Sequence, residues 1–237
     1  MGDDRQPVLR LAGVSKQHRG LRPLRVRALT VSAGERVALS GLDAGAAETL
    51  VNLVTGASVP DEGTVDVGGR STASISDGDE WLSWLDRFGI LSPRAVLLDG
   101  ATLLQNLAMP FSLAIDPIPP DIAAQAMRLA EEVGIDRASL DKPVAAVDAL
   151  ARARAHLARA VALDPSLLIL EHPTVGFAAG ESRPFGEAVV RVSQTRSLAT
   201  LMISEDSDFA AAAATRRLAL QAATGDLRPA RRRFFGF

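Results

Sequence analysis

RVALSGLDAGAAETLVNLVT, residues 36–55, is the stretch of this chain that decides its fold. Val37, Ala38 and Leu39 form a short apolar run typical of a buried strand, and the glycine-containing residues 41–46 predict a turn. Apolar residues then recur at the spacing of a helix. A strand, a glycine turn and a helix in this order outline a phosphate-binding loop, in which backbone N–H groups and the helix N-terminus hold a polyphosphate.

The loop departs from the pattern G-x-x-x-x-G-K-[ST] after its first glycine. Ala46, Ala47 and Glu48 stand where the second glycine, the lysine and the metal-binding hydroxyl belong. Taken alone, such a loop is also compatible with an ordinary strand–turn–helix. The candidate nucleotide-contacting residues of the loop are Gly41, Asp43, Gly45, Ala46, Ala47, Glu48 and Thr49.

Composition bounds the possible classes of protein. The 237 residues carry a net charge of −2 and no cysteine, so thiolate metal sites and disulfides are excluded and nucleic acid is not an expected partner. No apolar run approaches the roughly 20 residues that cross a bilayer, and MGDDRQP lacks the regions of a signal peptide, which indicates a cytoplasmic protein. The end RPARRRFFGF, residues 228–237, is either a solvated tail or a contact for a partner or an acidic membrane surface.

The rest of the chain predicts an α/β fold. Short apolar runs at residues 8–11, 26–31 and 64–67 suggest an antiparallel sheet, while 88–91, 167–170 and 198–203 read as further strands, with a last strand at 218–221. Helical spacing appears at 102–111, at 121–133 after a proline-rich linker with Asp121 as N-cap, at 148–163 and at 185–192. Glu171, His172 and Glu205 follow buried strands, where open α/β sheets place ligand chemistry.

Four segments in this order resemble the ATP-binding subunit of an ATP-binding-cassette (ABC) transporter. They are SAGERVALSG, VTGASVPDEGTVDVGG, LLDGATLLQNLAMPF and ARAVALDPSLLILEHPT. The resemblance covers nearly the whole chain. It implies a P-loop NTPase-like core sheet with an antiparallel β lobe and a helical lobe over about 100–155, forming one domain over 1–228, and a separate basic and aromatic tail over 229–237.

Carried over residue by residue, the functional positions are mostly altered. The glutamine that contacts metal and attacking water aligns with Pro93, the signature LSGGQ with residues 147–151, and the aspartate of the following loop with Ala178. The acidic pair that ends the buried strand aligns with Glu171, which could hold a metal, and with His172 at the position of the base. The switch histidine aligns with Glu205, and His18 is a candidate to stack on a base.

The resemblance implies ATP and magnesium as cofactors, but the altered positions predict impaired or absent hydrolysis. The leading hypothesis is a non-catalytic partner in a transport complex. It would lie at the inner face of the cell membrane, dock on a membrane-spanning permease near residues 94–111, and pair with a sister subunit or with itself. The alternatives are an active ATPase that uses Glu171 and His172, and a soluble regulatory or scaffold protein. If the loop keeps its cradle, Ala47→Lys with Glu48→Ser should tighten nucleotide binding by at least about tenfold, while hydrolysis should still fail.

Overall fold

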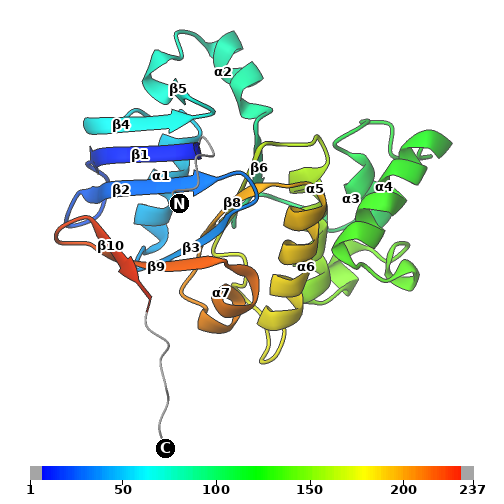
Figure 1. Ribbon diagram of the computed structural model, residues 1–237. Coiled ribbons are helices and arrows are strands. Elements are labelled where there is room, and N and C mark those ends of the chain that lie inside the picture. Colours follow the sequence, from blue (N-terminus) through cyan, green and yellow to red (C-terminus); the bar gives the residue numbers. More distant parts are fainter. Residues whose placement is uncertain (1–6, 231–237) are drawn as a thin grey trace, which may run out of the picture.

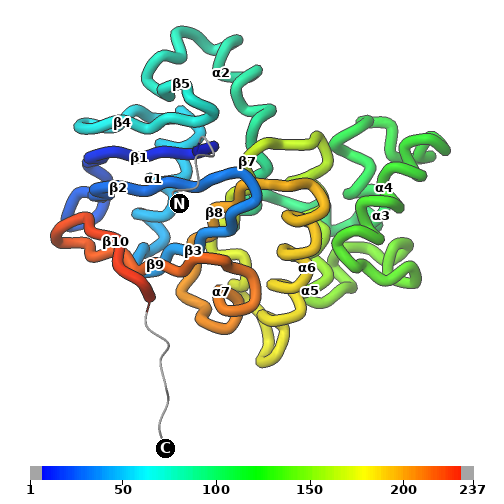
Figure 2. The backbone as a smooth tube through the Cα atoms, viewed as in Figure 1, coloured from blue at the N-terminus to red at the C-terminus, as the bar shows by residue number. Residues whose placement is uncertain are grey.

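The computed structural model describes residues 7–230, which form two sheets and a set of helices (Figure 1). The antiparallel strands lie on one side of the core sheet and the helical lobe lies on the other (Figure 2). Within the described range no helix is long and apolar enough to cross a membrane.

The smaller sheet is antiparallel with the order β2-β1-β4-β5. Its strands are β1 (Pro7–Lys16), β2 (Leu24–Ser32), β4 (Glu62–Val67) and β5 (Arg70–Ser71). β1 pairs with β2 on one edge and with β4 on the other. The antiparallel sheet predicted from the first 70 residues is therefore confirmed, and a helix α2 (Gly78–Leu85) follows it.

The core sheet has six strands in the order β10-β9-β3-β8-β7-β6. They are β3 (Arg36–Ser40), β6 (Phe88–Leu91), β7 (Leu167–Glu171), β8 (Ala199–Ile203), β9 (Arg216–Gln221) and β10 (Asp226–Pro229). The strands from β9 to β6 are parallel, and β10 turns back antiparallel to β9. The predicted mixed sheet that contains residues 36–40, 167–170 and 198–203 is confirmed.

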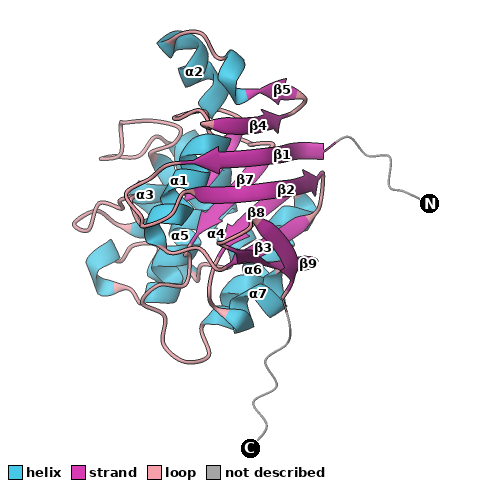
Figure 3. Ribbon diagram, turned by 90° about the vertical axis from the view of Figure 1, so that its left-hand side faces the viewer, coloured by secondary structure: helices cyan, strands magenta, loops and turns pink. Residues whose placement is uncertain are grey.

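The apolar runs of the central strands are buried because both faces of the core sheet are covered. Leu167 and Ile169 of β7 pack into the cluster that includes α1 (Ala44–Val54) and the antiparallel sheet, whereas Leu168 and Leu170 pack against the helices of the opposite face. Helix α1 thus lies between the two sheets (Figure 3). Because α1 packs between the two sheets, its first residues are held at the carboxyl end of β3.

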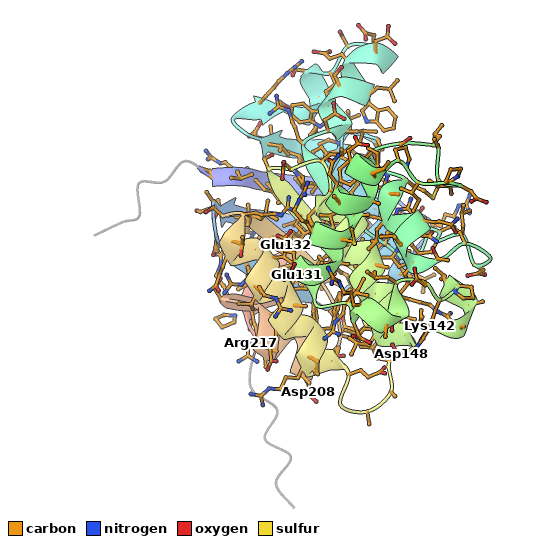
Figure 4. All side chains as sticks on the ribbon, turned by 90° about the vertical axis from the view of Figure 1, so that its right-hand side faces the viewer. Glu131, Glu132, Lys142, Asp148, Asp208 and Arg217 are labelled. Atoms are coloured by element: carbon orange, nitrogen blue, oxygen red, sulfur yellow. The ribbon has the colours of Figure 1, made fainter. Side chains whose placement is uncertain are left out.

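The helical lobe consists of α3 (Leu103–Ala108), α4 (Pro120–Val133) and α5 (Ala149–Val161), with one-turn 3₁₀ segments at Arg137–Ser139 and Val144–Ala146. Helices α6 (Ser182–Thr195) and α7 (Ser207–Ala213) belong to the core. Arg196, after α6, donates to both carboxylate oxygens of Glu132 at 2.7 Å each. Glu132 lies in the last turn of α4 (Figure 4), so an ion pair ties the lobe to the core.

Three predicted boundaries are wrong. The turn after β3 ends at Asp43 and not at residue 46, because Asp43 caps α1. Asp121 is not an N-cap, since α4 begins at Pro120 and proline is favoured in the first helical turn. The strand at 218–221 is not the last, because β10 pairs with it as a hairpin. The domain limits 1–228 and 229–237 stay predictions, and residues 231–237 of the tail lie outside the described range.

Gly89→Ala tests the contact between β6 and α5. A Cβ at Gly89 would lie 2.2 Å from the Ala160 carbonyl oxygen, which is backbone and has no rotamer to yield. We expect the free energy of unfolding to fall by about 2–3 kcal/mol in chemical denaturation. The control is Gly100→Ala, where a Cβ would meet nothing within 4 Å. Equal stability of the two variants would contradict this packing.

Candidate functional site

The carboxyl ends of four neighbouring parallel strands meet at one edge of the core sheet. The turn after β3 begins with Gly41, Glu171 ends β7 with His172 after it, β8 leads to Glu205, and β6 leads to Pro93 and Arg94. Because parallel strands end at the same edge, groups spread over some 165 residues of sequence gather there. This edge is the candidate site.

The connection between β3 and α1 is only Gly41, Leu42 and Asp43. The Asp43 carboxylate accepts from the N–H of Ala46 at 2.8 Å, and the Asp43 carbonyl accepts from the N–H of Ala47 at 2.8 Å. Leu42 is buried beneath the turn. Two of the N–H groups that a phosphate cradle would present, those of Ala46 and Ala47, are therefore bound by Asp43 of the loop itself.

The side chains that follow the turn point away from an anion site. Ala47, at the position of the lysine, is fully buried in the apolar cluster between the sheets. The Thr49 hydroxyl donates to the Gly45 carbonyl at 2.7 Å, one turn back along its own helix. Glu48 is half-exposed and brings a negative charge to the start of α1.

Glu205 supplies an anion to the first glycine of the loop. Its Oε1 accepts from the Gly41 N–H at 2.6 Å. Gly41 has φ +86°, and a Cβ there would lie 2.7 Å from the Leu220 carbonyl oxygen, so only glycine fits. A carboxylate of the chain thus binds the N–H that opens the predicted cradle.

The neighbouring Asp206 holds the segment that carries Glu205. Its Oδ1 accepts from the N–H groups of Asp208 and Phe209 at 3.0 Å each, capping α7, and its other oxygen accepts from the Ser182 hydroxyl. Burial alone would raise the pKa of Asp206, but these hydrogen bonds to the charged form hold the pKa below its usual value. The segment is therefore anchored on both α6 and α7.

The Glu171 carboxylate forms a bidentate ion pair with Arg94. Arg94 Nη1 lies 2.9 Å from Glu171 Oε1 and Nη2 lies 2.7 Å from Oε2. The Glu171 side chain is only 2% exposed, whereas that of Arg94 is 46% exposed. Arg94 Nη1 also lies 3.9 Å from Glu48 Oε1. The guanidinium therefore sits between the two acidic side chains that the resemblance places near a metal.

Magnesium prefers oxygen ligands in octahedral geometry, usually one or two carboxylates and several waters. Glu171 and Glu48 are ligands of that kind, but both oxygens of Glu171 already accept from Arg94. The residues present therefore fit a magnesium ion only after Arg94 is displaced.

His172 does not face the loop. Its backbone is left-handed, with φ +43°, and its N–H donates to the Ile203 carbonyl at 2.8 Å, which extends the β7–β8 pairing. Nε2 is buried without a hydrogen-bond partner in the described part of the chain. The ring lines a cavity of about 390 Å³ together with Pro93, His156 and Phe177.

His18 lies in a second cavity, of about 410 Å³, which Gly41, Asp43 and Ala46 also line. His18 Nδ1 accepts from the Gly20 N–H at 3.1 Å. A Cβ at Gly45 would lie 3.7 Å from that nitrogen. The structure therefore brings His18 to the loop but leaves it apart from His172, since the two cavities share no lining residue.

The segment at the signature position, residues 147–151, opens α5 (Figure 4, Asp148). The Asp148 carboxylate accepts from the Ala151 N–H at 2.7 Å and caps the helix. In the loop at the aspartate position, the Ala178 N–H donates to Glu181 Oε2 at 2.7 Å. Side chains of the same chain again occupy N–H groups near helix starts.

Arg94 is a site residue that the sequence did not predict, since it was expected only as the start of the docking segment at residues 94–111. Arg94 directly follows Pro93 at the carboxyl end of β6, the strand beside β7. Its N–H donates to the Ser92 hydroxyl at 3.1 Å, in a turn that directs the residue back toward β7. An arginine at the end of a strand adjacent to Glu171 was the available signal.

Arg94→Ala should lower the free energy of unfolding by about 2–3 kcal/mol, because it leaves the buried Glu171 carboxylate without its partner. This expected loss of stability is small for a buried ion pair because the Arg94 side chain is 46% exposed and its charge is partly solvated. The control is Arg183→Ala, which breaks an exposed pair with Glu187 and should change stability by less than about 0.5 kcal/mol. Urea denaturation measures both, and similar effects would contradict the burial argument.

Ala47→Lys with Glu48→Ser should not tighten nucleotide binding about tenfold, although an open cradle predicts that it would. The new lysine would replace a fully buried alanine inside the apolar cluster, and the N–H groups of Gly41 and Ala46 are already bound. We expect stability to fall by roughly 2 kcal/mol. Titration with a fluorescent ATP analogue and a denaturant melt measure this, with Glu48→Ser alone as control. A tenfold gain in affinity would show that the turn opens.

The sequence profile of the family described as ABC transporter matches residues 24–175. The chain is 28% identical over 191 residues to the lipoprotein-releasing system ATP-binding protein LolD of Alcanivorax borkumensis, covering 81% of this chain and 83% of LolD. It is 26% identical over 184 residues to the ABC transporter ATP-binding protein YtrE of Bacillus subtilis, covering 77% and 78%.

Solved structures agree on the fold. The structure of cbiO1 from Clostridium perfringens, part of the ABC transporter complex cbiONQ, has a TM-score of 0.76 at 18% identity over 91% of this chain and 85% of that one. The dimeric ATP-binding cassette MJ0796 bound to ADP and Pi has a TM-score of 0.73 at 17% identity over 97% and 100%. With more than half of its residues matched by the family profile, the chain belongs to the ABC transporter family as an ATP-binding subunit, or nucleotide-binding domain.

Proposed function

We propose that this chain is a non-hydrolysing ATP-binding-type subunit that acts as a structural partner in an ABC transport complex. The observation that carries the proposal is the bidentate pairing of Glu171 with Arg94, at 2.9 and 2.7 Å, in place of a free carboxylate for metal. Phosphoryl transfer depends on positioned cations and hydrogen-bond donors around the transferred group. Here Arg94 takes the place of a metal cation at Glu171, and side chains of the chain bind the N–H groups of Gly41 and Ala46.

The electrostatics of the site support the same conclusion. Glu48 and Glu205 add negative charge around the turn where an anionic triphosphate would lie, and no lysine stands at Ala47 to offset them. Charge repulsion is strong in a partly dry site. His172, at the position of the base, has its Nε2 buried in a cavity apart from the loop, which does not favour activation of water there.

The partners follow from the family and from the surface. ATP-binding subunits of ABC transporters work with membrane permease subunits and dimerise. We propose that this chain docks on a permease through residues 94–111 and pairs with a sister subunit or a second copy, at the inner face of the membrane. The segment presents Val96 and Leu98, 71% and 45% exposed. Leu163 exposes 60% of its surface and lines a surface cavity together with Ala95 and Pro110, so it suits the same apolar contact.

One observation favours a second candidate, an ATPase with substituted chemistry. Nε2 of His172 has no hydrogen-bond partner among the described residues and His172 lines a cavity, while Glu171 directly precedes His172 in the sequence. This candidate requires Arg94 to leave Glu171 so that a metal can bind. We rank it second because it needs that rearrangement.

The purified chain should release phosphate from ATP no faster than a protein-free blank, with or without magnesium. The reason is that the positions for lysine, base and switch carry Ala47, His172 and Glu205. Continuous phosphate detection measures the rate, and B. subtilis YtrE assayed in parallel serves as a comparison. Steady release that disappears in His172→Ala would sink the proposal and favour the second candidate.

A further inference from the structure

Arg94 places one positive charge between a buried and an exposed carboxylate. Its guanidinium donates to both oxygens of Glu171, and Nη1 lies 3.9 Å from Glu48 Oε1. The Glu171 side chain is 2% exposed and that of Glu48 is 50% exposed. Two carboxylates thus converge on one cation from different elements, β7 and α1.

The backbone that carries this cation is held on both sides. The turn begins at Ser92. The Arg94 N–H donates to the Ser92 hydroxyl at 3.1 Å, and the Ala95 N–H donates to the Ser92 carbonyl at 2.9 Å. Two residues after Arg94, the Val96 carbonyl accepts a hydrogen bond at 2.8 Å from Arg159 Nη1 of α5. The guanidinium is therefore delivered to Glu171 by a fixed turn.

Arginine suits this position chemically. Its planar fork matches both oxygens of a carboxylate, and it stays charged at every pH at which a protein is folded. A lysine or a loosely held surface cation would neutralise the charge without occupying both oxygens. The same two carboxylates, without the guanidinium, are the oxygen ligands that a hard divalent cation takes together with waters.

We propose that Arg94 is a built-in substitute for a divalent cation: it neutralises Glu171, keeps metal out, and covers a latent Mg²⁺- or Mn²⁺-binding site made by Glu171 and Glu48. The inference concerns the metal position only. It does not depend on whether the chain docks on a permease.

The proposal is tested by titrating the nucleotide-free full chain with Mn²⁺. Electron paramagnetic resonance measures the concentration of free Mn²⁺ at each step. Wild type should show no Mn²⁺ site that depends on Glu171. Arg94→Gln, which removes the charge but keeps a polar side chain, should bind one Mn²⁺ about tenfold or more tightly than wild type. Mn²⁺ should also raise the melting temperature of Arg94→Gln and leave that of wild type unchanged.

Two control variants test whether the Mn²⁺ site depends on Glu171 and whether loss of an unrelated arginine has the same effect. Arg94→Gln with Glu171→Gln should lose the new site, and Arg183→Gln, which breaks an exposed pair on α6, should behave as wild type. Absence of a gain in Arg94→Gln, or a gain that survives Glu171→Gln, overturns the proposal. So does a wild-type Mn²⁺ site that Glu171→Gln abolishes.

If Arg94→Gln is not soluble, Arg94→Met replaces it, because methionine keeps an unbranched side chain without the charge or the hydrogen-bond donors. It should bind Mn²⁺ more tightly than wild type, and equal affinity overturns the proposal. Phosphate release by the wild-type chain would contradict the proposed function, and it would leave the Mn²⁺ result standing because the titration contains no nucleotide.

Discussion

The buried carboxylate of Glu171 is the constraint on which the rest of the site depends. It ends β7, the strand that is buried on both faces, and only 2% of the side chain reaches solvent. An ionised carboxylate in such a place is strongly destabilising unless a cation and hydrogen-bond donors satisfy it. In an ABC-type site a metal ion would supply that cation. Here a guanidinium supplies it, so the folded state needs no ligand to balance this charge.

The anion-binding half of the site follows the same logic. N–H groups at the start of a helix attract anions, and they cost free energy if they are buried without a partner. Asp43 and Asp148 cap α1 and α5, and Glu205 binds the N–H of Gly41. Each of these acceptors belongs to the chain. The described chain thus has the fold of a nucleotide-binding domain, and its own carboxylates bind the N–H groups of Gly41, Ala46 and Ala151.

Much of the fold could be predicted because its strands are short apolar runs bounded by turns. Residues 36–40 and 88–91 coincide with β3 and β6, since both faces of those strands are covered and no polar residue interrupts them. The turn after β3 was predicted too long because the glycines pointed to a loop, while the capping ability of Asp43 decides where α1 begins. The hairpin strand β10 was missed because DLRP has no apolar alternation.

The sequence predicted where the residues of the candidate site lie, but it did not predict which of their side chains contact one another. The resemblance pointed to Glu171, His172 and Glu205, and the parallel strands bring them to one edge of the sheet. Which side chains pair there depends on strand order, and β6 lies beside β7 although 75 residues separate Leu91 from Leu167. Arg94 can pair with Glu171 only because β6 lies beside β7 in the sheet.

A physical link between substitutions follows from this arrangement. Ala47 and Glu48 stand where the resemblance places a lysine and a metal-binding hydroxyl, so no lysine charge lies at this edge. Without a metal or Arg94, the Glu171 carboxylate would be a buried uncompensated charge. Either Glu171 must become neutral or a cation must arrive from the chain. Arg94 is that cation, and its second carboxylate neighbour, Glu48, is a residue that would oppose a bound phosphate but favours a guanidinium. Glu205 and Arg94, which we propose to disfavour nucleotide and metal binding, are thus also side chains whose contacts stabilise this structure.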